Sequence, residues 1–320
     1  MNERINTSEF APLNKKKVLL TGAHGFIGRN CLEHLVSNGY NVHATSTNKI
    51  SEFSEDITWH SANLLDNSEV EDLLDKICPE YLLHFAWYTN HGKFWNAIEN
   101  SLWVDASISL LKSFAKFGGE RAVFAGSCAE YDWDYGFCNE RITPTNPTTM
   151  YGTCKYATNI IVSSLAKELG ISLAWGRIFS PFGPFENPQR LIPSMILSML
   201  NNKNAVCNNH NLFRDFMFVN DVARAFVALL NSSFCGNINI SSGEAVSLAE
   251  VVLKIAHILN KPDLVKFGSL PTPQREPKFL IGDNRLLTSC INFKPVSNFE
   301  TGIHSTITWW KLQKGFSNAH

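Results

Sequence analysis

The chain has 320 residues, of which 44% are hydrophobic and 18% charged, as in an ordinary globular protein with a sizeable core. A formal net charge of −1 gives no basic surface for nucleic acid or an anionic membrane. The eight cysteines form no C-x-x-C pair, and no apolar run is long enough to span a membrane. We therefore expect a metal-free, reduced protein of the cytoplasm, in which residues 1–15 form a flexible, polar extension.

Apolar strands and amphipathic helices alternate through the first 180 residues. We expect strands at 18–20, 41–46, 57–60, 81–86, 122–125 and 171–178, and helices at 22–39, 68–77, 96–117 and 150–169. This alternation predicts an α/β fold, with a Rossmann-type, doubly wound parallel sheet over residues 16–180.

The pattern loosens after residue 180, where prolines and glycines interrupt it. Residues 181–204 and 241–315 are expected to form a smaller substrate-binding cap, with helices at 191–200, 248–259 and 302–310. Residues 205–240, with a helix at 221–230 and a strand at 237–240, are expected to return to the main sheet. Ligands of such sheets bind at the carboxyl ends of the strands, so the cap should close over a substrate there.

A glycine motif, Thr21-Gly-Ala-His-Gly-Phe-Ile-Gly28, joins the first strand to the first helix. This strand–turn–helix context is the one in which a dinucleotide diphosphate binds. Gly22 would permit the tight turn, Gly25 the close approach of the phosphates, and Gly28 the packing of helix on strand.

The end of the second strand commonly selects between the nicotinamide cofactors, because a carboxylate there bonds the ribose 2′-hydroxyl of NAD. Here Ser46 and residues 47–49 offer hydroxyls and a lysine but no carboxylate, and Arg29 could add charge. These residues favour NADP(H), with NAD(H) and a non-selective loop as the alternative. The expected cofactor contacts are Gly22, His24, Gly25, Phe26, Ile27, Gly28, Arg29, Ser46, Thr47, Asn63, Leu64, Ala86, Tyr151 and Lys155.

Tyr151 and Lys155 are four residues apart, which places them on one face of a helix. An ammonium beside a phenol stabilises the phenolate and is expected to lower the pKa of Tyr151. Ser127 follows an apolar strand and could hydrogen-bond the same substrate oxygen. The three residues predict a proton-transfer site opposite a hydride carrier.

Five motifs occur in the order typical of one family: TGAHGFIG, GSCAEYDW, YGTCK, GRIFSPFGP and RDFMFVNDVA. On these motifs the chain resembles the extended short-chain dehydrogenases/reductases of the NAD-dependent epimerase/dehydratase group, over roughly residues 16–312. The resemblance implies that Ser127, Tyr151 and Lys155 are the catalytic triad and that Lys155 also holds the nicotinamide ribose. It further implies a homodimer in which the helices at 96–117 and 150–169 form a four-helix bundle.

Most enzymes of this group act on nucleotide-diphosphate sugars, so the resemblance implies a substrate of that class. Arg214 and Arg275 match the positions of arginines that clamp the diphosphate, and a guanidinium fork suits phosphate oxygens. Each arginine could instead form a surface salt bridge. Cys128 and Arg177 are the other expected substrate contacts.

The residues after Ser127 bear on the reaction. In similar 4,6-dehydratases an Asp-Glu pair follows the catalytic hydroxyl residue, whereas Cys128 and Ala129 stand here, and alanine cannot transfer a proton. Similar 3,5-epimerases have a cysteine two residues after the serine, whereas Cys128 directly follows Ser127, so the role of Cys128 stays open. The absence of a carboxylate at Ser46 favours an exchanging cofactor and hence a reductase. The resemblance further implies that the reaction is reduction of the 4-keto group of a nucleotide-linked 4-keto-6-deoxyhexose. A 4-epimerase with retained NAD is the alternative, and a non-catalytic dinucleotide-sensing protein a more remote one.

An aromatic stretch at 87–95 follows the fourth strand and should border the cleft. Its rings could shape the sugar pocket or pack beneath a loop, and the sequence favours neither.

Overall fold

A computed structural model describes residues 15–47, 56–268 and 276–315. Its central sheet has seven parallel strands in the order β12-β7-β5-β4-β1-β2-β3. The strands are β1 (Lys17–Thr21), β2 (Asn41–Ser46), β3 (Ile57–Ser61), β4 (Tyr81–His84), β5 (Arg121–Ser127), β7 (Ser172–Ile178) and β12 (Gly236–Ile240). This order confirms the predicted Rossmann-type sheet.

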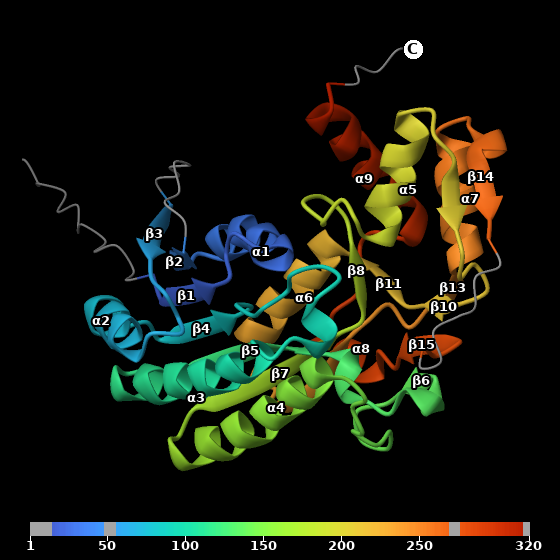
Figure 1. The fold of residues 1–320 in the computed structure, drawn as a ribbon. Helices are drawn as coiled ribbons and strands as arrows, with labels where there is room; N and C mark the ends of the chain where they lie inside the picture. The colour runs from blue at the N-terminus through green and yellow to red at the C-terminus, as the bar shows by residue number, and fades with distance from the viewer. Residues whose placement is uncertain (1–14, 48–55, 269–275, 316–320) are drawn as a thin grey trace, which may run out of the picture.

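Helices cover both faces of this sheet (Figure 1). One face is covered by α1 (Phe26–Ser37) and α6 (Val219–Asn231), and the other by α2 (Asn67–Ile77), α3 (Asn100–Lys116) and α4 (Met150–Glu168). Alternation along each strand explains the two cores: Leu20 packs on the α1 and α6 side, whereas Leu19 packs on the α2 and α3 side. The helix predicted over 96–117 begins later, at Asn100, and is preceded by the 3₁₀ turn η1 (Phe94–Asn96).

The cap contains a four-stranded sheet in the order β13-β10-β15-β6, a short pair β9–β14 and three helices. Its strands are β6 (Phe137–Cys138), β9 (Ala205–Cys207), β10 (Phe213–Arg214), β13 (Val246–Ser247), β14 (Val265–Phe267) and β15 (Phe279–Gly282), and its helices α5 (Leu191–Leu200), α7 (Leu248–Ile258) and α9 (Phe299–Gln313). The helix α8 (Arg285–Ile291), which was expected with the cap, packs instead on the core of the main sheet through Leu287. A two-stranded sheet, β8 (Ser180–Phe182) with β11 (Phe216–Phe218), lies between the two parts of the chain. Within the segment 205–240, α6 and β12 lie with the main sheet, whereas β9 and β10 pair with cap strands.

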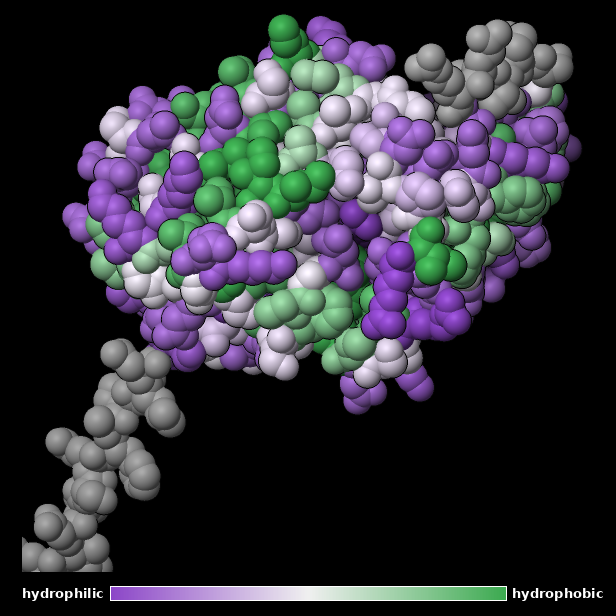
Figure 2. Space-filling view, turned by 90° about the horizontal axis from the view of Figure 1, so that it is seen from below, coloured by the Kyte–Doolittle hydropathy of each residue, from purple (hydrophilic) through white to green (hydrophobic). Residues whose placement is uncertain are grey.

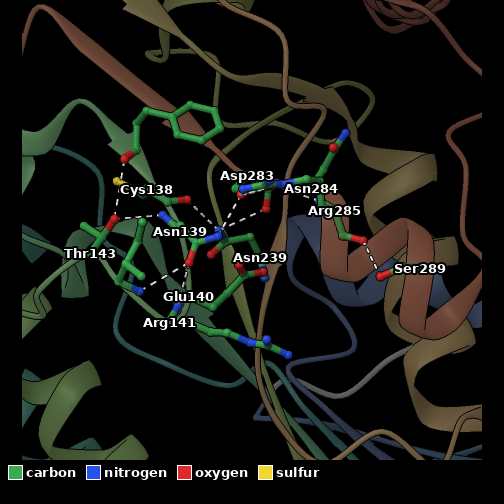
Figure 3. Close-up of polar contacts among 12 residues, drawn as sticks. Cys138, Asn139, Glu140, Arg141, Thr143, Asn239, Asp283, Asn284, Arg285 and Ser289 are labelled. Atoms are coloured by element: carbon green, nitrogen blue, oxygen red, sulfur yellow. Dashed lines mark hydrogen bonds and ion pairs between the residues drawn. The ribbon is translucent and has the colours of Figure 1, made fainter.

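A polar cluster joins the cap sheet to the end of β12 (Figure 3). The Asn239 side-chain amide donates to the backbone carbonyls of Cys138 and Asp283, at 2.9 and 3.2 Å. Asn139 donates to the Asp283 carboxylate at 2.7 Å, and Glu140 accepts the Asn239 backbone N–H at 2.8 Å. These bonds satisfy backbone groups of β6 and β15 and so fix the cap against the carboxyl edge of the main sheet.

Over the described ranges no helix is long and apolar enough to cross a membrane, and no group of three or more potential metal-ligating side chains is found.

Candidate active site

The glycine turn, Ser127 and the start of α4 lie at the carboxyl edge of the parallel sheet. Ser127 is the last residue of β5, and Tyr151 and Lys155 lie in the first two turns of α4. The Thr149 hydroxyl accepts the Gly152 N–H at 3.0 Å and begins that helix as its N-cap. The fold thus brings the three expected catalytic residues to one edge, where open parallel sheets bind their ligands.

The Ser127 hydroxyl is oriented by the turn that follows it. Its oxygen accepts the backbone N–H of Ala129 at 3.1 Å, which leaves its own hydrogen available to donate. Its backbone N–H in turn donates to Glu130 at 2.8 Å, which completes a capping box. The turn therefore presents Ser127 as a hydrogen-bond donor toward the site.

Tyr151 lies among aromatic rings from the predicted aromatic stretch. The rings of Phe94, Trp95 and Trp87 stand nearly perpendicular to it, with centroids at 5.0, 5.7 and 6.5 Å. Burial raises the pKa of Tyr151 well above its usual value, and a hydrogen bond with Ser127 opposes this in part. The shift is opposite to the one we expected from Lys155, because desolvation of the phenolate outweighs the favourable contacts.

Lys155 is buried beneath the aromatic stretch. Its Nζ donates to the Ala125 carbonyl at 2.9 Å and lies 3.7 Å from the centre of the Trp87 ring. Burial lowers the pKa of Lys155 to about 7, although the nearby Glu130 carboxylate acts to raise it. The protein alone therefore holds this lysine close to the midpoint between amine and ammonium at neutral pH.

The glycine turn fits a dinucleotide diphosphate. Gly25 is the N-cap of α1 and no side chain caps that helix, so the first N–H groups of α1 are available to an anion. A Cβ on Gly28 would lie 2.3 Å from the Gly22 carbonyl oxygen, and one on Gly22 would lie 2.7 Å from the Ala86 backbone nitrogen. The turn is thus held tight against α1 and against the chain after β4, while His24 and Gly25 are exposed at its tip.

The other expected cofactor residues line the same edge of the sheet. Ser46 ends β2, and Thr47 beyond it is exposed, whereas residues 48 and 49 lie outside the described residues. Asn63 is exposed and Leu64 buried after β3. The Arg29 guanidinium lies over the Phe185 ring, 4.7 Å from its centre, so its charge is near the glycine turn but stacked on an aromatic face.

The expected substrate residues separate into two groups. Arg214 donates to the Phe213 and Pro277 carbonyls and pairs with Glu276 at 2.9 Å. Burial raises the pKa of the Cys128 thiol to about 12, and the charge of Arg214 opposes this rise. Arg177 is directed elsewhere, since its guanidinium is 2% exposed and pairs with the buried Glu130 at 2.9 Å. This internal pair leaves Arg177 without a free face for a diphosphate. Arg275 lies outside the described residues.

Two buried carboxylates organise the backbone at this edge, and the sequence reasoning missed the first of them. Glu130 completes the Ser127 capping box, and the Ser-x-x-Glu spacing of that box was the available signal. Asp215 accepts the backbone N–H groups of Ser242, Gly243 and Gly282, so it joins the loop after β12 to β15. Burial raises the pKa of Asp215 to about 6, and these bonds oppose the rise.

Fold and site together are those of an α/β protein with a Rossmann-type sheet, a glycine turn after β1, and Ser127, Tyr151 and Lys155 at the carboxyl edge. The NAD dependent epimerase/dehydratase family matches the chain over residues 18–241, and the chain belongs to this family of enzymes. The chain is 23% identical to a probable dTDP-glucose 4,6-dehydratase of Sinorhizobium fredii, over 94% of each chain.

Solved structures show the same fold. The UDP-N-acetylglucosamine 4-epimerase of Methanobrevibacter ruminantium superposes with a TM-score of 0.85 at 23% identity, covering 94% of this chain and all of that one. MoeE5, solved in complex with UDP-glucose and NAD, superposes with a TM-score of 0.81 at 26% identity, covering 93% of this chain and 99% of that one.

Proposed function

We propose that the protein reduces the 4-keto group of a nucleotide-linked 4-keto-6-deoxyhexose with a reduced nicotinamide cofactor. The observation that carries this proposal is an intact Ser127–Tyr151–Lys155 site followed by Cys128 and Ala129, where similar 4,6-dehydratases have an Asp-Glu pair. Glu130 is the next carboxylate along the chain, and its bonds to Arg177 and Ser127 commit it to the protein interior. A 4,6-dehydratase would need a carboxylate facing the sugar.

The geometry suits Tyr151 as the acid of a reduction. When the cofactor is bound it supplies the hydride, and the diphosphate of that cofactor would be held by the N–H groups at the start of α1. The Ser127 hydroxyl would donate a hydrogen bond to the keto oxygen, and Tyr151 would give the proton to the same oxygen. Because burial raises its pKa, Tyr151 is protonated at neutral pH and has that proton to give.

The substrate class is supported by the surroundings of Tyr151. Phe94 and Trp95 pack edge-on against its ring, and Trp133 stands at 5.9 Å from Trp95. Aromatic rings favour the apolar face and the methyl group of a deoxysugar over a charged carbon 6. Arg214, beside Cys128, would bind the diphosphate, which would displace Glu276 from its guanidinium.

We infer NADP(H) as the favoured cofactor, because Ser46 and the exposed Thr47 stand where a carboxylate would select NAD. The complex of MoeE5 with NAD makes NAD(H) the alternative for this chain.

The proposed activity is tested with a panel of nucleotide 4-keto-6-deoxyhexoses and both reduced cofactors, followed by absorbance and by product analysis. We expect stoichiometric oxidation of the cofactor, faster with NADPH than with NADH. Interconversion of UDP-glucose and UDP-galactose without added cofactor would show a 4-epimerase instead. Binding of a dinucleotide without turnover of any sugar nucleotide would favour the dinucleotide-sensing alternative.

We also propose a homodimer formed by α3 and α4. These helices pack on each other at the lower side of the molecule, and apolar side chains gather on that side (Figures 1 and 2). Leu102 on α3 and both Ile160 and Ile161 on α4 are exposed large hydrophobic residues. Two such pairs would bury one another in a four-helix bundle.

Ile160→Asp is therefore expected to convert a dimer into a monomer, because a carboxylate would be desolvated at the bundle. Multi-angle light scattering at micromolar concentration measures the change. Ile142→Asp is the matched control, since Ile142 is 79% exposed and Ile160 is 51% exposed, but only Ile160 lies on these helices. A wild-type protein that is monomeric under these conditions would contradict the proposed dimer.

All eight cysteines are free thiols, which suits the reducing cytoplasm that we infer as the location of the protein.

A further inference from the structure

Glu130 is a fully buried carboxylate with four hydrogen-bond donors. One of its oxygens accepts the Ser127 backbone N–H and the Trp175 indole N–H, both at 2.8 Å. The other accepts the Arg177 guanidinium at 2.9 Å and the Asn159 side-chain amide at 3.2 Å. Both oxygens therefore have two partners, and the charge is balanced by a guanidinium that is 2% exposed.

These four donors come from three elements that meet behind the site. Ser127 ends β5, and Trp175 and Arg177 lie two residues apart on β7, so that both point to the face covered by α3 and α4. Asn159 lies on α4, one turn beyond Lys155 and two turns beyond Tyr151, and so belongs to the same stripe of that helix. A bond to Asn159 consequently fixes the rotation of the stripe that carries both catalytic residues.

The contact between α4 and the turn of Glu130 is close. A Cβ on Gly152 would lie 2.2 Å from the Ala129 carbonyl oxygen, so the first turn of α4 rests directly on the turn η2 (Cys128–Glu130). Gly126 is equally constrained, because its Cβ would lie 2.1 Å from the Trp175 indole nitrogen and 2.6 Å from Glu130. The carboxylate is thus enclosed by backbone on one side and by β7 and α4 on the other.

We propose that Glu130 is a positioning residue for catalysis, which sets the place of Ser127 relative to Tyr151 and Lys155. The catalytic part of this inference rests on the proposed function of those three residues. The positional part rests on the four bonds alone, since one carboxylate holds the end of β5 and the inner stripe of α4 at fixed distances.

The Glu130 carboxylate also acts on the pKa of Lys155. Burial lowers the pKa of Lys155, and Glu130 is the charge that raises it. Tyr151 on the same helix and His84 on β4 face the same volume, and burial together with Lys155 lowers the pKa of His84 to about 3, so that histidine is neutral. Arg177 on β7 faces Glu130 from the opposite side. Removing the carboxylate would therefore lower the pKa of Lys155 further, and activity that needs its ammonium would end at a lower pH.

Glu130→Gln tests this inference. The glutamine oxygen can accept from Ser127 and Trp175, but its amide hydrogens would face the donors of Arg177 and Asn159. We expect kcat to fall about 10- to 100-fold with little change in KM, because reacting groups would be misplaced without loss of substrate contacts. We also expect the alkaline limb of the kcat/KM profile to move to lower pH.

Asp221→Asn is the matched control for lost stability. Asp221 is also fully buried, pairs with Arg224 at 2.6 Å and accepts the backbone N–H groups of Val296 and Ser297, but it lies on α6, away from the site. This variant should lose comparable thermal stability and keep the wild-type kcat and pH profile. A folded Glu130→Gln protein with wild-type kcat and pH profile would overturn the inference.

Asn159→Ala is the second test if Glu130→Gln fails to fold. It removes the bond between Glu130 and α4 and, besides that, only the bond that the Ser163 hydroxyl donates to Asn159 within α4. We expect a lower kcat at unchanged KM, and an unchanged kcat would overturn the positional role.

A titration of the Lys155 ¹³Cε resonance, assigned by its absence from Lys155→Arg, needs no substrate. Its midpoint should lie lower in Glu130→Gln than in the wild type, and equal midpoints would overturn the electrostatic role. If the proposed substrate is wrong, the wild type and all variants will be inactive with it, whereas the titration of Lys155 will be unaffected.

Discussion

Tyr151→Phe is expected to lower kcat by about 10²- to 10⁴-fold, the usual contribution of a positioned general acid. The change removes only the hydroxyl, so the edge-on contacts with Phe94 and Trp95 stay and the protein should fold normally. Cofactor affinity should change little, because the glycine turn that would hold the diphosphate is untouched. Steady-state rates and fluorescence titration with the reduced cofactor measure the two effects.

Tyr156→Phe is the matched control, since Tyr156 lies on the same helix, outside the stripe that carries Tyr151 and Lys155. It should leave kcat within about twofold of the wild type, as expected for a surface change. Near wild-type turnover by Tyr151→Phe would show that another group supplies the proton and would contradict the mechanism.

Gly152→Ala is expected to lower kcat by about 100-fold, the cost of moving a catalytic group by about 1 Å. The new methyl carbon would lie 2.2 Å from the Ala129 carbonyl oxygen, which belongs to backbone and cannot rotate away. Either α4 or the turn η2 must shift, and Tyr151 and Ser127 are carried by those two elements. Alanine favours a helix more than glycine does, so the helix itself should form.

Thr153→Ala provides the comparison for this variant, because Thr153 is the next residue of α4 and is exposed. Its kcat and thermal unfolding temperature should match those of the wild type. If Gly152→Ala also kept the wild-type kcat, the close packing of α4 on η2 would not be needed to place Tyr151.

The parallel sheet could be predicted because its strands are short and apolar and alternate with helices in sequence. The central strands bury both faces, as Leu19 and Leu20 do on β1, and such apolar runs can be recognised without long-range information. The limits of η1 and α3 were harder to predict, since they depend on a distant contact. Asn100 accepts the Trp87 indole N–H and donates to the Phe94 and Ala97 carbonyls, which ends the loop and starts α3.

The candidate site was predictable where spacing alone determines it. Tyr151 and Lys155 are four positions apart, and any helix would place them on one face. Their electrostatics were not predictable in this way, because desolvation depends on how deeply the fold encloses each group. The expected fall in the pKa of Tyr151 is therefore reversed, and Lys155 bonds a backbone carbonyl instead of the phenol.

The arginines show a second limit of sequence reasoning. Arg214 was given two interpretations, a phosphate clamp or a salt bridge, and in the structure it pairs with Glu276 while lying beside Cys128. The salt bridge is therefore present, and the phosphate clamp stays a prediction, since an ion pair can also hold a guanidinium ready for an incoming anion. Arg177 was expected at the substrate, but its partner Glu130 lies 47 positions away in the chain, and only the fold brings the two together.

Hydride transfer to carbon 4 is tested most directly by isotope labelling. The protein is incubated with a nucleotide 4-keto-6-deoxyhexose and NADPH that carries deuterium at both positions of the nicotinamide C4, and the product is analysed by proton NMR and mass spectrometry. We predict one deuterium at carbon 4 of the sugar, with one equivalent of cofactor oxidised for each product formed. Product without deuterium at that carbon, or turnover without net oxidation of the cofactor, would contradict the proposed reduction.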